Sequence, residues 1–140
     1  MTLVLDTDVI IAGLRSPAGG AAALLREIRQ GRSTLLLSPA LVLEYEAQCN
    51  LLEHRRASGL TSEEIDDLLD SLVLLAEPVE TFFRWRPQLR DPGDEMVLEA
   101  AINGRAEVIV TFNRRDYRDG SARFGIEVLT PGEALRKMRS

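Results

Sequence analysis

The sequence contains little of the side-chain chemistry on which many enzymes depend. Its 140 residues include one cysteine, one histidine and one lysine. Cys49 alone cannot form an internal disulfide, and one Cys with one His nearly excludes a zinc centre built on thiolates and imidazoles. His54 lies in the charged stretch Glu-His-Arg-Arg, which we interpret as a solvated helix face rather than part of a catalytic triad.

Membrane and export signals are also missing. No apolar run approaches the ~20 residues of a membrane span, and the chain starts Met-Thr-Leu-Val-Leu-Asp, without a basic segment. We therefore expect no signal peptide, no membrane contact and a cytoplasmic location. The net charge of −5 argues against a broad nucleic-acid-binding surface. All but one of the 17 basic residues are arginines, which suit bidentate phosphate contacts.

Short apolar runs without polar alternation predict strands that are buried on both faces, as in a parallel sheet. We expect these strands over residues 3–5, 34–37, 107–111 and 126–129, with a short edge strand over 79–83. Helical patterns separate them. The alternation of strand and helix predicts a doubly wound α/β fold, which we assign as a three-layer α/β/α sandwich with a mainly parallel central sheet. Residues 1–140 are expected to form it as one domain.

Four of the expected helices begin with capping signals. A serine followed by proline predicts an N-cap and a first helical residue at Ser16 and again at Ser38. Thr61 and Glu64 have the spacing of a capping box. Asp91 precedes a proline in the same way as the two serines, and further helices are expected after residue 6 and over 131–138.

Acidic and amide side chains gather after the predicted strands, where doubly wound sheets form their sites. They are Asp6, Asp8, Glu44, Asp91, Asp94, Glu95, Asn113 and Asp116. Carboxylates packed together raise one another's pKa, and a hard divalent cation such as Mg²⁺ or Mn²⁺ relieves this and suits phosphoryl chemistry. Local roles stay open: Asp91 is a good N-cap, Asp94 favours the helix dipole, and Asn113 and Asp116 fit turns.

Four stretches resemble the motifs of the PIN (PilT N-terminus) domain family. The opening motif is similar to Asp-Thr-Asp-Val-Ile at 6–10, and the second to SPALVLEY at 38–45, where Glu44 takes the acidic position. The third is similar to DPGDEMVLEAA at 91–101, with Asp94 as the metal-binding acid, and the fourth to VTFNRRDY at 110–117. The resemblance covers about residues 2 to 131.

This resemblance implies a ribonuclease that cleaves single-stranded RNA with Mg²⁺ or Mn²⁺. The small bacterial members it is most similar to are virulence-associated protein C (VapC) toxins of toxin–antitoxin pairs. A cognate antitoxin protein and a second copy of the chain, forming a homodimer, are the implied partners. The implied reaction is hydrolysis of a phosphodiester bond by activated water, which leaves a 5′-phosphate.

Carried over by position, Asp6, Glu44 and Asp94 would hold the metal. The fourth motif leaves open whether Asn113 or Asp116 acts as the fourth catalytic residue. It also leaves open whether one or two metals bind, because an amide weakens a second site. The resemblance further implies supporting roles and RNA-phosphate contacts. The supporting residues are Thr7, Asp91, Glu95, Thr111 and Asn113, and the phosphate contacts are Arg114, Arg115 and Arg118.

Two other functions fit parts of this pattern. A PIN fold without catalysis would act as a binding module, although the retained acidic set argues against it. The first aspartates also fit a haloacid-dehalogenase-type phosphatase, whose first aspartate is the nucleophile. That chemistry needs a lysine near the aspartates, and Lys137 lies three residues from the end of the sequence. No glycine-rich phosphate loop follows the first strand, which disfavours nucleotide binding.

Overall fold

Five parallel strands form one sheet in the order β3-β2-β1-β4-β5. The structure is a computed structural model that describes residues 1–80 and 92–140, apart from the side chains of residues 92, 93 and 118–120. The strands are β1 (Thr2–Leu5), β2 (Thr34–Leu37), β3 (Glu77–Pro78), β4 (Val108–Val110) and β5 (Glu127–Leu129). The predicted parallel α/β architecture is confirmed.

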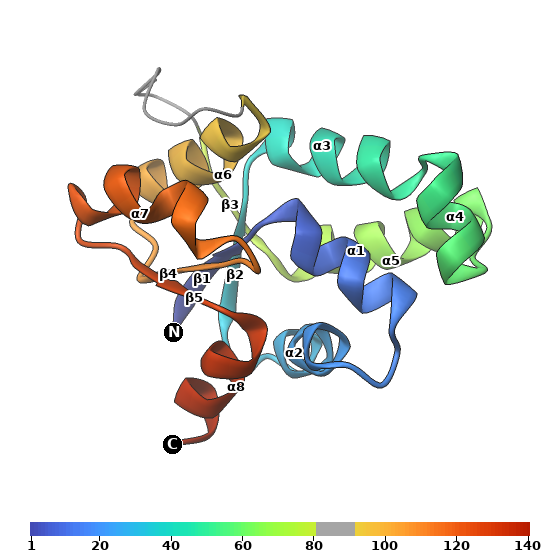
Figure 1. The fold of residues 1–140 in the computed structure, drawn as a ribbon, viewed down its shortest axis with the longest axis horizontal. Coiled ribbons are helices and arrows are strands. Elements are labelled where there is room, and N and C mark those ends of the chain that lie inside the picture. The colour runs from blue at the N-terminus through green and yellow to red at the C-terminus, as the bar shows by residue number, and fades with distance from the viewer. Residues whose placement is uncertain (81–91) are drawn as a thin grey trace.

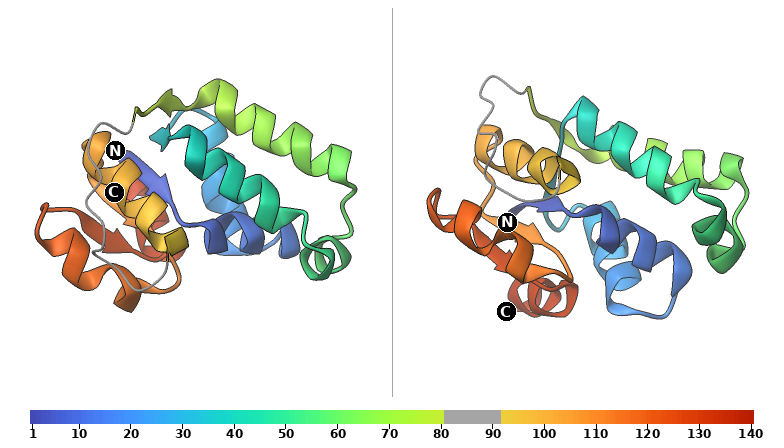
Figure 2. Two further views of the ribbon diagram at one scale, coloured as in Figure 1. Left: turned by 90° about the horizontal axis from the view of Figure 1, so that it is seen from above. Right: turned by 45° about the horizontal axis from the view of Figure 1, so that its top comes forward.

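Helices cover both faces of this sheet, as expected for a three-layer sandwich. In Figure 1, α6 and α7 lie on one side of the strands and α2 and α8 on the other, and Figure 2 shows α3, α4 and α5 extending beside them. The helices within the described ranges are α1 (Thr7–Arg15), α2 (Gly20–Arg29), α3 (Pro39–Cys49), α4 (Leu52–Ser58), α5 (Ser62–Leu75), α6 (Pro92–Asn103), α7 (Arg114–Ala122) and α8 (Pro131–Arg139).

The strand order places a topological switch point between β1 and β4. The chain builds the sheet outward from β1 through β2 to β3, then returns through α6 to place β4 on the other side of β1. Leu5 and Val110 are paired at the carboxyl ends of the two strands. In open α/β sheets, ligand sites form beyond the strand ends at such a point. Residues that directly follow Leu5 and Val110 are therefore brought together by topology alone.

Continuous apolar runs correctly identified the inner strands. Every residue of β4 and all of β1 except Thr2 is buried, because helices pack on both faces and leave no solvent side for polar residues. The edge strand was placed wrongly. It forms at Glu77–Pro78, where it pairs with the end of β2, and residues 81–83 of the expected strand lie outside the described residues.

Two of the capping predictions are confirmed, and one is wrong. The Ser38 hydroxyl accepts a hydrogen bond from Leu41 N at 3.2 Å, and Thr61 forms a full capping box with Glu64. Ser16, in contrast, is the C-cap of α1, and the next helix begins only after Gly19. The serine–proline pair there continues a turn instead of opening a helix. The proposed cap at Asp91 lies outside the described residues.

No single helix in the described ranges is long and apolar enough to cross a membrane. The helices α1 and α2 satisfy that test only when they are taken together across a bend of 104°. Both contribute residues to the hydrophobic core, among them Val9, Ile10, Leu24 and Ile28.

Candidate active site

Asp6 lies at the switch point, between the last residue of β1 and the first of α1. Its backbone N–H donates to the carbonyl oxygen of Val110 at 2.9 Å, so the strand pairing fixes its position. The Asp6 side chain is buried, and its Oδ2 accepts a hydrogen bond from Thr111 Oγ1 at 2.7 Å. Thr111 directly follows β4, so the two ends of the paired strands are joined by this bond. The sequence predicted both residues for the site.

Asp8, in the first turn of α1, completes a carboxylate pair. Its Oδ2 accepts hydrogen bonds from Phe112 N and Asn113 Nδ2, each at 3.1 Å, and lies 3.4 Å from Thr111 Oγ1. Its Oδ1 is buried and has no hydrogen-bond partner in the described part of the chain. The sequence placed Asp8 among the acids that follow the strands, but it was not assigned as a metal-binding or catalytic residue. The signal that could have found it is the Asp-x-Asp spacing itself, because the first turn of α1 keeps both acids at the same end of the strand.

Asp94 joins the site through a tyrosine that the sequence did not single out. Tyr117, in α7, is fully buried, and its hydroxyl donates to Asp94 Oδ1 at 3.0 Å. The same hydroxyl also hydrogen-bonds Asp6, which lowers the pKa of that carboxyl. Asp94 lies in the first turn of α6. Tyr117 therefore links the carboxylates that end β1 and begin α6.

Burial and mutual repulsion dominate the electrostatics. Burial, followed by the charge of Asp8, raises the pKa of Asp6 from 3.8 to about 6, and hydrogen bonds from Thr111 and Tyr117 lower it again in part. Burial also raises the pKa of Asp8, with a smaller contribution from Asp94. Burial and the charges of Asp6 and Asp94 raise the pKa of Tyr117, so its hydroxyl stays a neutral donor. Within the described chain, no basic side chain pairs with Asp6 or Asp8.

Comparison with known proteins identifies the family of the chain. The sequence model of the PIN domain family matches residues 2–115. The chain belongs to the PIN domain family. Its fold is also similar to a chain in the crystal structure of VapBC2 from Rickettsia felis bound to a DNA fragment from their promoter, with 14% identity and a TM-score of 0.59. That match covers 92% of this chain and 97% of that one. None of the curated proteins compared with this chain matches it.

The PIN motifs therefore contribute unequally to the acidic cluster. Glu44 is half-buried on α3, which packs against both α1 and α6. Its carboxylate makes no hydrogen bond to the aspartates that the structure describes. Glu95 is buried on α6. The Thr7 hydroxyl makes no hydrogen bond to a described residue, whereas the Thr7 backbone N–H bonds Asp6 and lowers its pKa. Asp91 lies outside the described residues.

In the fourth PIN motif, the structure brings Asn113 rather than Asp116 to the carboxylates. Asn113 donates to Asp8, while Asp116 is exposed in the first turn of α7, and its side chain bonds no described residue. The matched family segment also ends before Asp116. Of the predicted phosphate contacts, Arg114 is paired with Glu133 at 3.1 Å and Arg115 is exposed. The side chain of Arg118 lies outside the described residues.

The oxygen-rich PIN site fits a hydrated divalent cation. Within residues 1–80 and 92–140, no three His, Cys, Asp or Glu side chains lie close enough together to form a complete metal-binding group. Mg²⁺ does not require one, because it keeps several waters and is commonly bound by one or two carboxylates. The buried, unpartnered Oδ1 of Asp8 is the observation that calls for such a ligand.

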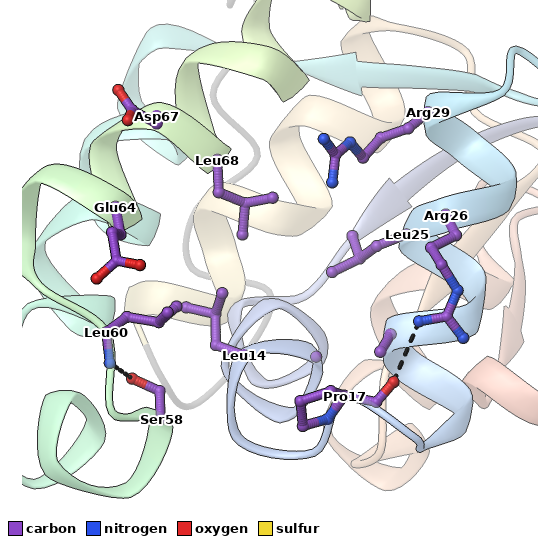
Figure 3. A pocket seen from close by; sticks show the side chains of 12 residues that line it. Leu14, Pro17, Leu25, Arg26, Arg29, Ser58, Leu60, Glu64, Asp67 and Leu68 are labelled. Carbon is purple, nitrogen blue, oxygen red and sulfur yellow. Dashed lines mark hydrogen bonds between the residues drawn. The ribbon is translucent and has the colours of Figure 1, made fainter.

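A separate cavity of about 580 Å³ lies away from this cluster, between α1, α2 and α5. Its walls are mainly apolar, with Leu14, Leu25 and Leu68 facing the hollow (Figure 3). Arg26 and Arg29 approach it from α2, and Glu64 and Asp67 from α5 (Figure 3). None of the aspartates of the acidic site lines it. It is therefore not part of the candidate active site.

Proposed function

We propose that this PIN-domain protein is a metal-dependent nuclease that hydrolyses single-stranded RNA. The observation that carries the proposal is the pair of buried Asp6 and half-buried Asp8 at the switch point, with raised pKa values and no basic partner among the described residues. A folded protein retains buried like charges when a ligand of opposite charge uses them. Membership of the PIN family supports a nuclease as that use.

Asp6 and Asp8 would hold the cation, with Asp94 held beside them by Tyr117. Glu44 would approach from α3, and Asn113 takes the fourth-motif position in place of Asp116. When bound, Mg²⁺ or Mn²⁺ supplies positive charge for the scissile phosphate and favours deprotonation of water. The hydroxyls of Thr111 and Tyr117 orient the carboxylates without neutralising them, because both are neutral donors. Hydrolysis would leave a 5′-phosphate and a 3′-hydroxyl.

The phosphatase alternative loses support from the position of its lysine. Lys137 lies in α8 and pairs with Glu127 of β5. No described lysine therefore reaches Asp6, as that chemistry requires. The binding-module alternative predicts a folded protein that does not cleave RNA.

Cleavage of a panel of labelled single-stranded RNAs tests the proposal directly. We expect products with 5′-phosphates in Mn²⁺ or Mg²⁺, none in EDTA, and none above background for Asp6→Asn. Asp70→Asn is the matched control, because Asp70 is exposed on α5 and bonds no described residue. Equal cleavage in EDTA, or full activity of Asp6→Asn, would contradict the proposal.

We further propose that the chain is the toxin of a bacterial pair, with an antitoxin protein as partner and a homodimer as its assembly. The likeness in fold to a chain of VapBC2 supports the toxin and its antitoxin partner. The exposed leucines on α3, α4 and α5 support the homodimer. Induced expression in a bacterium should arrest growth, and Asp6→Asn should relieve the arrest. Equal growth arrest by wild type and Asp6→Asn would contradict a toxin that acts through the nuclease site.

A further inference from the structure

The loop between β4 and α7 exposes an aromatic side chain beside the acidic site. Phe112 is 50% exposed, and the other large apolar side chains exposed in the described ranges are aliphatic. They are Leu43, Leu51, Leu52, Val73, Leu74 and Leu75, all on or beside α3, α4 and α5. An exposed apolar residue is ordinary by itself. Phe112 differs from the others because its backbone is hydrogen-bonded to the acidic site.

The backbone of Phe112 is attached directly to the carboxylate pair. Its N–H donates to Asp8 Oδ2 at 3.1 Å. The residue before it, Thr111, bonds Asp6, and the residue after it, Asn113, bonds Asp8 through its side-chain amide. Three consecutive residues therefore tie this loop to the acidic site. The residue that carries the exposed ring is therefore hydrogen-bonded through its backbone to a carboxylate proposed to bind the metal.

An exposed arginine, Arg115, follows Phe112 in the sequence. Arg115 lies three residues along, in the first turn of α7, where it is exposed and pairs with no described residue. Its neighbour Arg114 is already engaged by Glu133. Proteins bind single-stranded nucleic acids with exposed aromatic rings, which stack on bases, and with cationic side chains, which contact the backbone. Phe112 and Arg115 offer one of each within four residues.

We propose that Phe112 stacks on a base of single-stranded RNA next to the cleaved phosphate, with Arg115 contacting an adjacent phosphate. This inference rests on the proposed nuclease function. Stacking on an aromatic ring is tolerant of sequence, because every base offers a π-face. Phe112 would therefore hold the strand in register with the carboxylates without selecting one base strongly.

Equilibrium binding of a short fluorescein-labelled RNA, in EDTA and at low salt, tests the inference without cleavage. Phe112→Ala should weaken binding about 5- to 100-fold. Phe112→Leu should weaken it similarly, because leucine keeps apolar area but has no aromatic face, and Phe112→Trp should retain it. Gln30→Ala removes an exposed, uncharged side chain at the C-cap of α2 and should leave binding unchanged. Arg115→Ala should reduce the salt dependence of binding by the equivalent of about one phosphate contact.

An RNA with one abasic position separates stacking from other causes of weaker binding. We expect one abasic position to weaken the binding of wild type. The same abasic RNA should bind Phe112→Ala as tightly as the intact RNA does, because that variant has no ring to stack on the missing base. Wild-type affinity in Phe112→Ala or Phe112→Leu would overturn the inference, and so would equal sensitivity of wild type and Phe112→Ala to every abasic position. If wild type cleaves RNA but these variants bind normally, only the inference fails. If wild type neither binds nor cleaves RNA, the proposed function fails with it.

Discussion

Replacing Asp6 by asparagine should stabilise the metal-free protein while removing its response to divalent metal. Burial and the charge of Asp8 raise the pKa of Asp6 to about 6, so the ionised carboxylate is unfavourable in the folded state. Asparagine has nearly the same shape and no charge. Its amide oxygen can still accept the hydrogen bond that Thr111 Oγ1 now donates to Asp6 Oδ2. The substitution therefore removes the repulsion and keeps most of the packing.

The size and sign of this effect follow from the pKa. The difference between 3.8 and about 6 corresponds to about 3 kcal/mol, at 1.36 kcal/mol for each pKa unit. Because the folded state binds this proton more tightly, the free energy of unfolding falls as pH rises from about 4 to about 6 and stays lowered above that range. Asp6→Asn removes this loss. We expect a gain of about 1 to 3 kcal/mol at pH 8 and little gain at pH 4.

Urea denaturation in EDTA, from pH 4 to pH 8, measures this difference. Asp70→Asn controls for the general effect of removing a negative charge and should change the free energy of unfolding by less than about 0.5 kcal/mol. Added Mn²⁺ should stabilise wild type by about 2.7 kcal/mol at one hundred times its dissociation constant, and should leave Asp6→Asn unchanged. A loss of stability in Asp6→Asn at pH 8, or an equal gain at pH 4 and pH 8, would refute the electrostatic reasoning.

Two further predictions concern single hydrogen-bonding groups. Tyr117→Phe keeps the buried ring and removes the hydroxyl that holds Asp94. Calorimetry should therefore show that this variant binds Mn²⁺ about 10- to 100-fold more weakly than wild type. The control Tyr45→Phe loses a buried hydroxyl that donates to Leu5 O and should bind Mn²⁺ normally. Equal losses in both variants would instead indicate general damage to the fold. Thr61→Ala removes the capping box of α5 and should lower the free energy of unfolding by about 1 kcal/mol in urea. Unchanged stability would show that the cap is dispensable.

The sequence predicted the elements whose side chains are buried in apolar surroundings. Strands such as Val108–Val110 were readable because packing on both faces requires an unbroken apolar run. Helix α7 was not predicted, because its sequence, RRDYRDGSA, is polar and offers no apolar stripe. Its fully buried tyrosine directs a hydroxyl at a carboxylate, and hydrophobic periodicity cannot reveal such a contact. The serine–proline pattern also misplaced the helix start near Ser16, because the backbone N–H of Ser16 bonds Ala12 O as the C-cap of α1 and α2 begins only at Gly20.

For the site, the sequence could identify which acids follow strands but not which of them meet. Asp6 and Thr111 are 105 residues apart and become neighbours only because β4 returns to the side of β1. Asp8 and Glu44 are both acids near strand ends, but among the described contacts only Asp8 is hydrogen-bonded to the loop after β4. Which acid contacts this loop depends on which helix starts at the switch point, and the strand order determines that helix.

The donors around the carboxylates explain how this site can remain charged. Asp6 and Asp8 accept hydrogen bonds from the hydroxyls of Thr111 and Tyr117, from the amide of Asn113 and from backbone N–H groups, and all of these donors are neutral. An arginine in their place would stabilise the folded protein more, because charge-assisted hydrogen bonds are stronger. It would also cancel the negative charge that attracts a divalent cation. Within the described residues, neutral donors fix the positions of the carboxylates without cancelling their charge. The instability predicted for the metal-free site and its proposed affinity for metal therefore have the same physical origin.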